Sequence, residues 1–225
     1  MPKISVITPS VRPEGLKLVE KALKRQTFRD FEFIPQGKTR ENKEGEYWTI
    51  YSDYNEAIKK SKGELIISWQ DHTFAKPDTL ERFWNHYQND KHAIVSAIGN
   101  KYQDENFIVQ TWQDPRQRSD QGSFYECNFN DIEINLASFP REAFYAVGGF
   151  DEFFNAYSSL CGLDVLARLL IIGGWKFYLD QTINSYSTEH GRMANWEENL
   201  PFGAGGAWEK KLQEYRINPK LNYLT

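Results

Sequence analysis

Hydrophobic and polar positions along the first hundred residues predict strands that alternate with helices. Short apolar runs rich in β-branched residues indicate buried strands, whereas apolar residues repeated every three or four positions indicate amphipathic helices. The expected strands are residues 3–8, 31–35, 65–69 and 93–98, and the expected helices are residues 14–26, 49–62 and 77–87. Such strand–helix–strand units favour an α/β fold with a mostly parallel sheet and right-handed crossovers.

Beyond residue 100 the alternation is less regular. Residues 36–47 in the first half and 114–124 in the second are polar, and we expect both to be loops, the second able to close over a ligand. The further strands expected are residues 107–112, 132–139, 176–179 and 183–186, and the further helices are residues 141–147, 163–172 and 208–215. Because there is no internal repeat or low-complexity linker, we expect one domain over residues 1–225, with two functional halves that meet near residue 100.

Charge and composition narrow the functional classes. The chain has 27 Lys and Arg against 31 Asp and Glu, a net charge of −4, so a large basic face for nucleic acid is not expected. No stretch approaches the roughly 20 apolar residues of a membrane span. Two cysteines are too few for a disulfide framework, and the N-terminus enters a strand pattern without a signal segment. These features predict a cytoplasmic location.

Polar residues follow three of the expected strands, where an open α/β sheet binds its ligands. The three clusters are Thr8-Pro9-Ser10, Gln36-Gly37-Lys38 and Gln70-Asp71-His72. No strand is followed by a GxGxxG motif, and a P-loop ending at Lys38 fails because Glu32 stands where its first glycine belongs. The clusters therefore predict a ligand site without identifying the ligand.

Asp71 and His72 suggest metal chemistry. A carboxylate and an imidazole at a strand end suit a divalent cation that bridges two phosphates, and His190 is a candidate to complete the site. Each also has an ordinary structural explanation, the aspartate as a turn or cap and the histidines as surface or packed side chains. Asp164, at the start of an apolar helix, either complements the helix dipole or acts as a general base, and its spacing favours neither.

Several segments, in the same order, resemble the family-2 glycosyltransferases, which have the GT-A fold. The segments are residues 4–10 with 18–27 and 30–34, residues 54–58 with 62–67, and residues 148–154 with 164–168 and 173–175. They resemble, in turn, the opening βαβ unit of the family, the approach to its DxD segment, and its acceptor-side block, which begins Gly-Gly-Phe-Asp-Glu. The resemblance covers roughly residues 3–190.

The resemblance implies a glycosyltransferase of the hexosyltransferase type. A Rossmann-like, mostly parallel sheet in residues 1–100 would bind a nucleoside-diphosphate sugar with Mn²⁺ or Mg²⁺, and a smaller mixed half in residues 101–225 would bind a glycan or other hydroxyl acceptor. Inversion at the anomeric carbon is expected. The residues assigned to the nucleotide sugar are Thr8, Pro9, Ser10, Gln36, Asn55, Gln70 and Asp71; those assigned to the metal are Asp71, His72 and His190; the base is Asp164; and Trp112, Phe150 and Tyr157 are candidates for the acceptor side.

The chain departs from the family pattern at its acidic motifs. The DxD segment reads Gln70-Asp71-His72, which keeps one carboxylate, and the catalytic Glu-Asp pair aligns with Cys161-Gly162. These losses leave a second hypothesis open, a catalytically inactive GT-A domain that only binds a nucleotide sugar or a glycan. A nucleotidyltransferase is disfavoured because the loop after the first strand contains a single glycine, Gly15.

Overall fold

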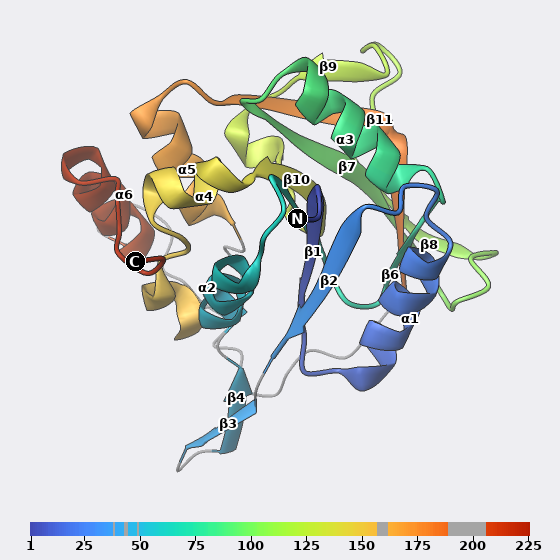
Figure 1. The fold of residues 1–225 in the computed structure, drawn as a ribbon, viewed down its shortest axis with the longest axis horizontal. Coiled ribbons are helices and arrows are strands. Elements are labelled where there is room, and N and C mark those ends of the chain that lie inside the picture. Colours follow the sequence, from blue (N-terminus) through green and yellow to red (C-terminus); the bar gives the residue numbers. More distant parts are fainter. Residues whose placement is uncertain (38, 43–44, 49, 157–161, 189–205) are drawn as a thin grey trace.

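The computed structural model describes residues 1–37, 39–42, 45–48, 50–156, 162–188 and 206–225. Its central sheet has the strand order β2-β1-β5-β10-β7-β11-β6, with β8 beside β7 and β9 beside β11 (Figure 1). The strands of this sheet are β1 (Ile4–Pro9), β2 (Phe31–Gln36), β5 (Leu65–Trp69), β6 (Thr73–Ala75), β7 (Ala93–Tyr102), β8 (Gln110–Gln113), β9 (Phe124–Glu126), β10 (Leu136–Pro140) and β11 (Lys176–Thr188). The helices are α1 (Pro13–Lys24), α2 (Ile50–Lys60), α3 (Thr79–Asn89), α4 (Arg141–Val147), α5 (Leu163–Ile172) and α6 (Ala207–Ile217), with 3₁₀ turns at Phe129–Asp131 and Glu152–Ala156.

The predicted α/β architecture is confirmed, and it is consistent with the GT-A fold that the resemblance implies. Strand β1 pairs in parallel with β2 and β5, and β7 pairs in parallel with β11. Strand β10 is the exception inside the sheet, because it runs antiparallel to both of its neighbours, β5 and β7. Its amino end therefore lies at the edge where the parallel strands have their carboxyl ends.

The structure corrects two expectations about local structure. The polar segment 36–47 is not only loop, because Thr39–Asn42 (β3) and Gly45–Trp48 (β4) pair as an antiparallel hairpin that projects from the body of the molecule (Figure 1). The two late strands are one strand, β11, whose register against β7 shifts between Asp180 and Asn184. The irregularity interrupts the alternation of buried and exposed positions, so the sequence read as two strands.

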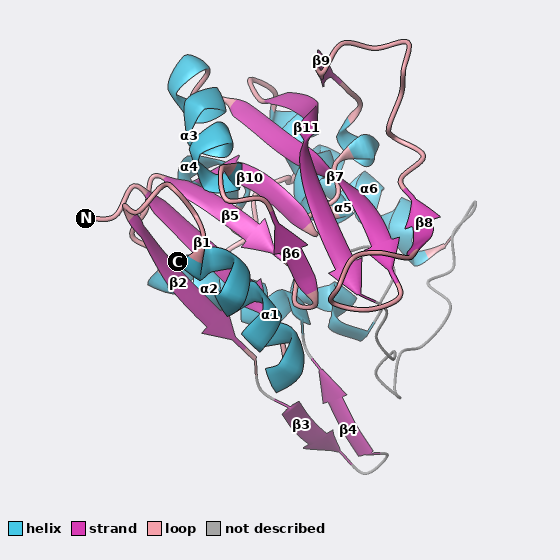
Figure 2. Cartoon of the chain, turned by 90° about the vertical axis from the view of Figure 1, so that its right-hand side faces the viewer, coloured by secondary structure: helices cyan, strands magenta, loops and turns pink. Residues whose placement is uncertain are grey.

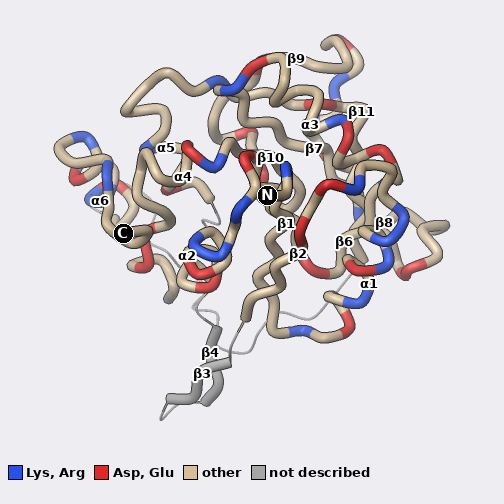
Figure 3. The backbone as a smooth tube through the Cα atoms, in the orientation of Figure 1, with Lys and Arg blue, Asp and Glu red and all other residues tan. Residues whose placement is uncertain are grey.

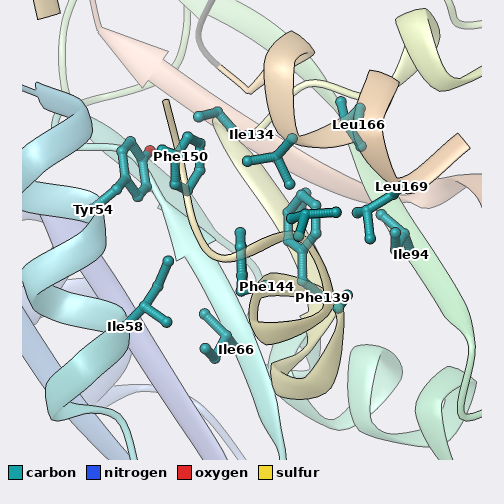
Figure 4. Packing of buried hydrophobic residues seen from close by; sticks show 14 of the residues in the cluster. Tyr54, Ile58, Ile66, Ile94, Ile134, Phe139, Phe144, Phe150, Leu166 and Leu169 are labelled. Atoms are coloured by element: carbon teal, nitrogen blue, oxygen red, sulfur yellow. The ribbon is translucent and has the colours of Figure 1, made fainter. Parts of the chain in front are cut away.

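Two hydrophobic clusters hold helices on opposite faces of the sheet, as the two views in Figures 1 and 2 show. On one face, α1 and α3 pack through residues such as Val19, Leu23 and Phe83. On the other face, α2, α4, α5 and α6 share a cluster in which Tyr54 stacks on Phe150 with ring centres 4.6 Å apart (Figure 4). Each of these helices thus buries its apolar face in one of the two clusters.

Basic and acidic residues are interspersed along the described chain (Figure 3). No helix among the described residues is long and apolar enough to cross a bilayer.

Candidate functional site

The candidate site lies at the edge of the sheet where β1 and β5 end. Ser10 directly follows β1, and Gln70 and Asp71 directly follow β5. Because β1 and β5 are parallel neighbours, these residues emerge side by side. The amino end of β10 joins them from the opposite direction, since the Gln70 amide donates to the Asn135 carbonyl over 2.7 Å.

Asp71 is the centre of this edge. Its side chain is only 1% exposed, and its Oδ2 accepts a hydrogen bond of 2.5 Å from the Ser10 hydroxyl. The Arg12 guanidinium, on the loop between β1 and α1, lies 3.4 Å from the same oxygen. The Ser10 Oγ also accepts the Arg12 amide over 2.9 Å, which fixes the loop beneath the aspartate. The structure therefore brings Ser10 and Asp71 together.

Three more predicted nucleotide-binding residues lie on or beside β1 and β2. Pro9 pairs with Gln36 across the two strands, and the Ser10 amide donates to the Gln36 carbonyl over 2.8 Å. Thr8 is fully buried, and its Oγ1 has no hydrogen-bond partner among the described residues. A buried hydroxyl without a partner is costly, and such a group at a strand end is a candidate ligand contact.

Asn55 lies elsewhere and has a structural environment. It is fully buried on α2, where its side-chain amide donates to the Phe150 carbonyl and to Glu152 Oε1, both over 3.0 Å, and its Oδ1 accepts the Phe150 amide. With both polar atoms used, Asn55 fastens the segment at Phe150 to α2. Phe150 itself is 1% exposed in the core rather than on an acceptor surface.

His72 is held by its backbone as well as its ring. Its φ is +56°, its amide donates to the Gly15 carbonyl over 3.3 Å, and its carbonyl accepts the Thr188 amide over 3.0 Å. Its Nε2 is 3.9 Å from Glu14 Oε1. A Cβ at position 15 would come within 2.5 Å of the ring, so only glycine allows this approach. His190 and Tyr157 lie outside the described residues.

The described residues do not fit a metal centre built from protein ligands. No group of three or more His, Cys, Asp or Glu side chains with suitable geometry occurs among them. The single carboxylate of the altered DxD segment, Asp71, already accepts from Ser10 and faces the Arg12 cation on the same oxygen. A cation beside that oxygen would be repelled by the guanidinium.

Asp164 lies in the interior instead of at the mouth of a cleft. It is 0% exposed, and its Oδ2 is 2.6 Å from Arg168 Nη2 and accepts the Asp151 amide over 2.8 Å. Burial raises the pKa of the Asp164 carboxyl, against the opposing effects of Arg168 and the Asp151 amide. Arg168, equally buried, also donates to the carbonyls of Val147 and Gly149. This is the environment of an ion pair that fixes α5 to the preceding loop, and it does not fit the base expected from the sequence.

Position 162, where the family pattern places a catalytic aspartate, cannot carry one without strain. Gly162 has φ of +87° as the residue before α5, in the left-handed region that disfavours residues with a side chain. A Cβ there would approach Ile134 Cγ2 to 2.5 Å. The glycine is thus required by the local backbone and by the packing of Ile134.

A pocket of about 210 Å³ opens at Gln70, the residue before Asp71. It is lined by Gln70, Thr73, Gly99, Lys101, Trp112, Glu133, Asn135, Ser185 and Ser187. Trp112 is 40% exposed and has the Lys101 ammonium 5.5 Å from its ring centre. One indole ring among amides, hydroxyls, one carboxylate and one ammonium suits a polyhydroxylated ligand with apolar C–H faces. The sequence analysis names Trp112 as a candidate for the acceptor side, and the structure places it on the wall of this pocket.

Glu133 and Asn135 are the lining residues that the sequence analysis missed. They alternate with Ile132, Ile134 and Leu136, which are buried. That alternation was noted as a strand pattern, and it places Glu133 and Asn135 together on the opposite side from the apolar residues. What it does not give is the direction of β10, which decides that this end of the strand meets Gln70.

Comparison with known families agrees with the resemblance. Residues 42–148 match the family model described as Glycosyl transferase family 2. The matched span runs from the β3–β4 hairpin through β5, Asp71 and the lining segment at Glu133 to the end of α4. No curated protein matches the chain.

Proposed function

We propose that this chain, a family-2-like glycosyltransferase, transfers a sugar from a nucleoside-diphosphate donor to an acceptor hydroxyl with inversion at the anomeric carbon. One observation carries the proposal. The carboxyl-edge residues Ser10 and Asp71 meet at 2.5 Å, and Gln70, the neighbour of Asp71 in the chain, lines a pocket of sugar-like polarity; Gln70 and Asp71 lie within the span that matches the family. A donor placed across this edge has its nucleotide near β1 and its sugar near Gln70.

The described residues divide by chemistry into two sets. Thr8, Pro9, Ser10 and Gln36, at the ends of β1 and β2, would contact the nucleotide through a hydroxyl without a partner and through backbone groups. Arg12 is the cation closest to Asp71, and a guanidinium suits the oxygens of a diphosphate. Asp71 and Ser10 would hold Arg12 and its loop for that contact. Stabilising charge on the leaving diphosphate is the electrostatic term expected to be largest.

The acceptor and the transferred sugar would share the pocket beside Gln70. Trp112 offers a flat apolar ring for the C–H face of a pyranose, and Asn135, Ser185 and Ser187 offer hydrogen bonds to its hydroxyls. Such a site excludes water only if it is filled, so we expect slow hydrolysis of the donor when no acceptor is present.

Ligand binding tests the proposal directly. A thermal-shift panel of UDP, GDP, CDP and their common sugar conjugates, with Mn²⁺, Mg²⁺ or EDTA, should contain at least one ligand that raises Tm. A ligand at 100 times its Kd stabilises the fold by about 2.7 kcal/mol, which is a rise of roughly 5–11 °C for a domain of this size. The panel also reports whether a divalent cation strengthens binding. A panel without any shift would refute a nucleotide-sugar site.

Substitution of Asp71 locates the site. Asp71→Ala should abolish the shift caused by the ligand that the panel identifies and should abolish nucleotide release, because Arg12 and Ser10 lose the group that holds them. Asp30→Ala, at an exposed position just before β2 at the opposite end of the parallel strands, is the matched control and should retain both. An Asp71→Ala protein that is folded and keeps the full shift would remove Asp71 from the site.

The missing family carboxylate at Gly162 favours one alternative, a domain that binds a nucleotide sugar or glycan without transferring it. Time-dependent release of the nucleoside diphosphate distinguishes the two functions. Release above the rate without protein supports the transferase, and binding without release supports the alternative.

A further inference from the structure

We propose that Glu133 is the general base that accepts the proton of the acceptor hydroxyl, in place of the carboxylate that position 162 lacks. This assignment rests on the transferase function proposed above. In the sequence, no motif singles out Glu133. The structure brings it to the edge where the parallel strands end, because β10 is antiparallel.

Other carboxylates near the acceptor-side block are already engaged. Asp164 is completely buried with Arg168. Asp151 is 1% exposed and accepts from Tyr215 over 2.8 Å and from Lys211 over 3.1 Å. Glu152 accepts from Ser52 and Asn55. Among the described residues that line the pocket, Glu133 is the only one with a carboxylate.

The Glu133 side chain is held at one oxygen and available at the other. Its Oε2 accepts from Asn135 Nδ2 over 3.3 Å and lies 3.3 Å from Arg116 Nη2. No hydrogen bond to its Oε1 occurs among the described residues, and the side chain is 43% exposed. Glu133 lines the pocket with one carboxylate oxygen held and with no hydrogen bond to the other among the described residues, which is the arrangement that a general base requires.

The support behind Glu133 is rigid. Arg116 also pairs with Asp114, which is 1% exposed and accepts the Gly99 amide over 2.7 Å. A further guanidinium nitrogen of Arg116 donates to the Asp131 carbonyl over 2.8 Å. The Glu133 amide donates to the Ser96 hydroxyl over 3.2 Å. Backbone and side chain of Glu133 are therefore both anchored to β7 and to the loop after β8.

The acidity of Glu133 suits the role. Partial burial raises the pKa of its carboxyl; among the charges that face it, Arg116 and Lys101 lower this pKa, and Asp114 raises it. A base is most effective when its pKa is closer to the working pH than that of an ordinary glutamate, provided it is still deprotonated.

The proposed step is a single displacement. The acceptor oxygen forms a bond to the anomeric carbon, while the bond from that carbon to the phosphate oxygen breaks and its electron pair leaves with the nucleoside diphosphate. The acceptor proton passes to Glu133 Oε1 and from there to solvent. Without a base, the attacking hydroxyl would have to lose its proton directly to water.

Glu133→Gln tests the assignment with the donor that the thermal-shift panel identifies, using nucleotide release with and without simple alkyl glycosides as acceptors. We expect kcat to fall by ~10²–10⁴-fold, with the Kd of the donor unchanged. In the wild-type protein kcat/KM should fall as pH drops through the pKa of Glu133, and the variant should lack this acidic limb. Glu126→Gln, at an exposed position on β9, is the matched control and should behave as wild type.

A measurement of Tm shows whether Glu133→Gln loses activity through catalysis or through unfolding. Because the Glu133 pKa is raised in the folded state, the ionised carboxylate is less favoured there than in the unfolded chain, and Glu133→Gln should not lower Tm at neutral pH. A folded Glu133→Gln protein that keeps full turnover, or whose kcat/KM still falls at low pH as in wild type, would overturn the assignment of Glu133 as the base but not the transferase function. A wild-type protein that binds and turns over no nucleotide sugar would overturn the transferase function, and Glu133 with it.

Discussion

The substitution Asp164→Asn tests whether Asp164 stabilises the fold through an ion pair or acts as the catalytic base, and a second, exposed ion pair in the same chain provides the control. Asp164 and Arg168 form an ion pair at spacing i,i+4 with 2.6 Å between charged atoms and both side chains 0% exposed. Asp78 and Arg82 form a second pair with the same spacing and the same 2.6 Å, but their side chains are 40% and 43% exposed. The two pairs differ chiefly in burial.

The expected costs follow from that difference. Asparagine preserves the shape of Asp164 and can still accept from the Asp151 amide, so the substitution mainly leaves the Arg168 charge buried without its partner. Breaking a buried pair in this way costs about 3–5 kcal/mol, which lowers Tm by roughly 6–20 °C in a domain of this size. Asp78→Asn removes a hydrated pair and should cost less than about 1 kcal/mol.

Urea denaturation and nucleotide release measure the two roles in the same samples. We expect Asp164→Asn to unfold at clearly lower urea than Asp78→Asn, and its turnover per folded molecule at low temperature to stay near that of wild type. Equal stability of the two variants would refute the structural role. A fall in turnover of ~10²–10⁴-fold with stability retained would instead make Asp164 the base.

Two further predictions concern the acceptor-side block. Gly162→Asp, which restores the family carboxylate, should lower the free energy of unfolding by about 2–5 kcal/mol, because the side chain forces strain on the left-handed backbone and overlaps with Ile134. Part of this cost should disappear in an Ile134→Ala background. A Gly162→Asp protein as stable as wild type in urea would contradict the packing described. Burial raises the pKa of Asp151, but hydrogen bonds from the Phe153 amide, Tyr215 and Lys211 outweigh it, so the pKa is lowered overall. Ionised Asp151 therefore stabilises the fold at pH values above the usual carboxyl pKa of about 3.9, and this stabilisation is lost as the pH falls through the lowered pKa. The stability difference between wild type and Asp151→Asn should therefore shrink from pH 7 to pH 3, and a difference that is constant with pH would show that the charge of Asp151 is not involved.

The sequence by itself determined the order of strands and helices in the first half and the family resemblance. It also predicted that Ser10 and Asp71 would share an edge, because parallel neighbours in a sheet place their carboxyl ends together, and local apolar patterns suffice to recognise such strands. From the sequence Trp112 was a candidate for the acceptor side; the structure places it in the pocket at Gln70, and its role there stays a prediction.

Only the tertiary structure decided what faces that edge. An apolar pattern with a period of two fixes which residues of a strand share a face but not the direction of the strand, so the antiparallel course of β10, and with it the position of Glu133, came from the path of the whole chain. The pattern around α5 likewise placed Asp164 in the first turn of the helix, but it did not decide whether the side chain is buried or exposed. Its burial with Arg168 depends on α5 packing against the loop at Gly149, a contact between segments that no local spacing encodes.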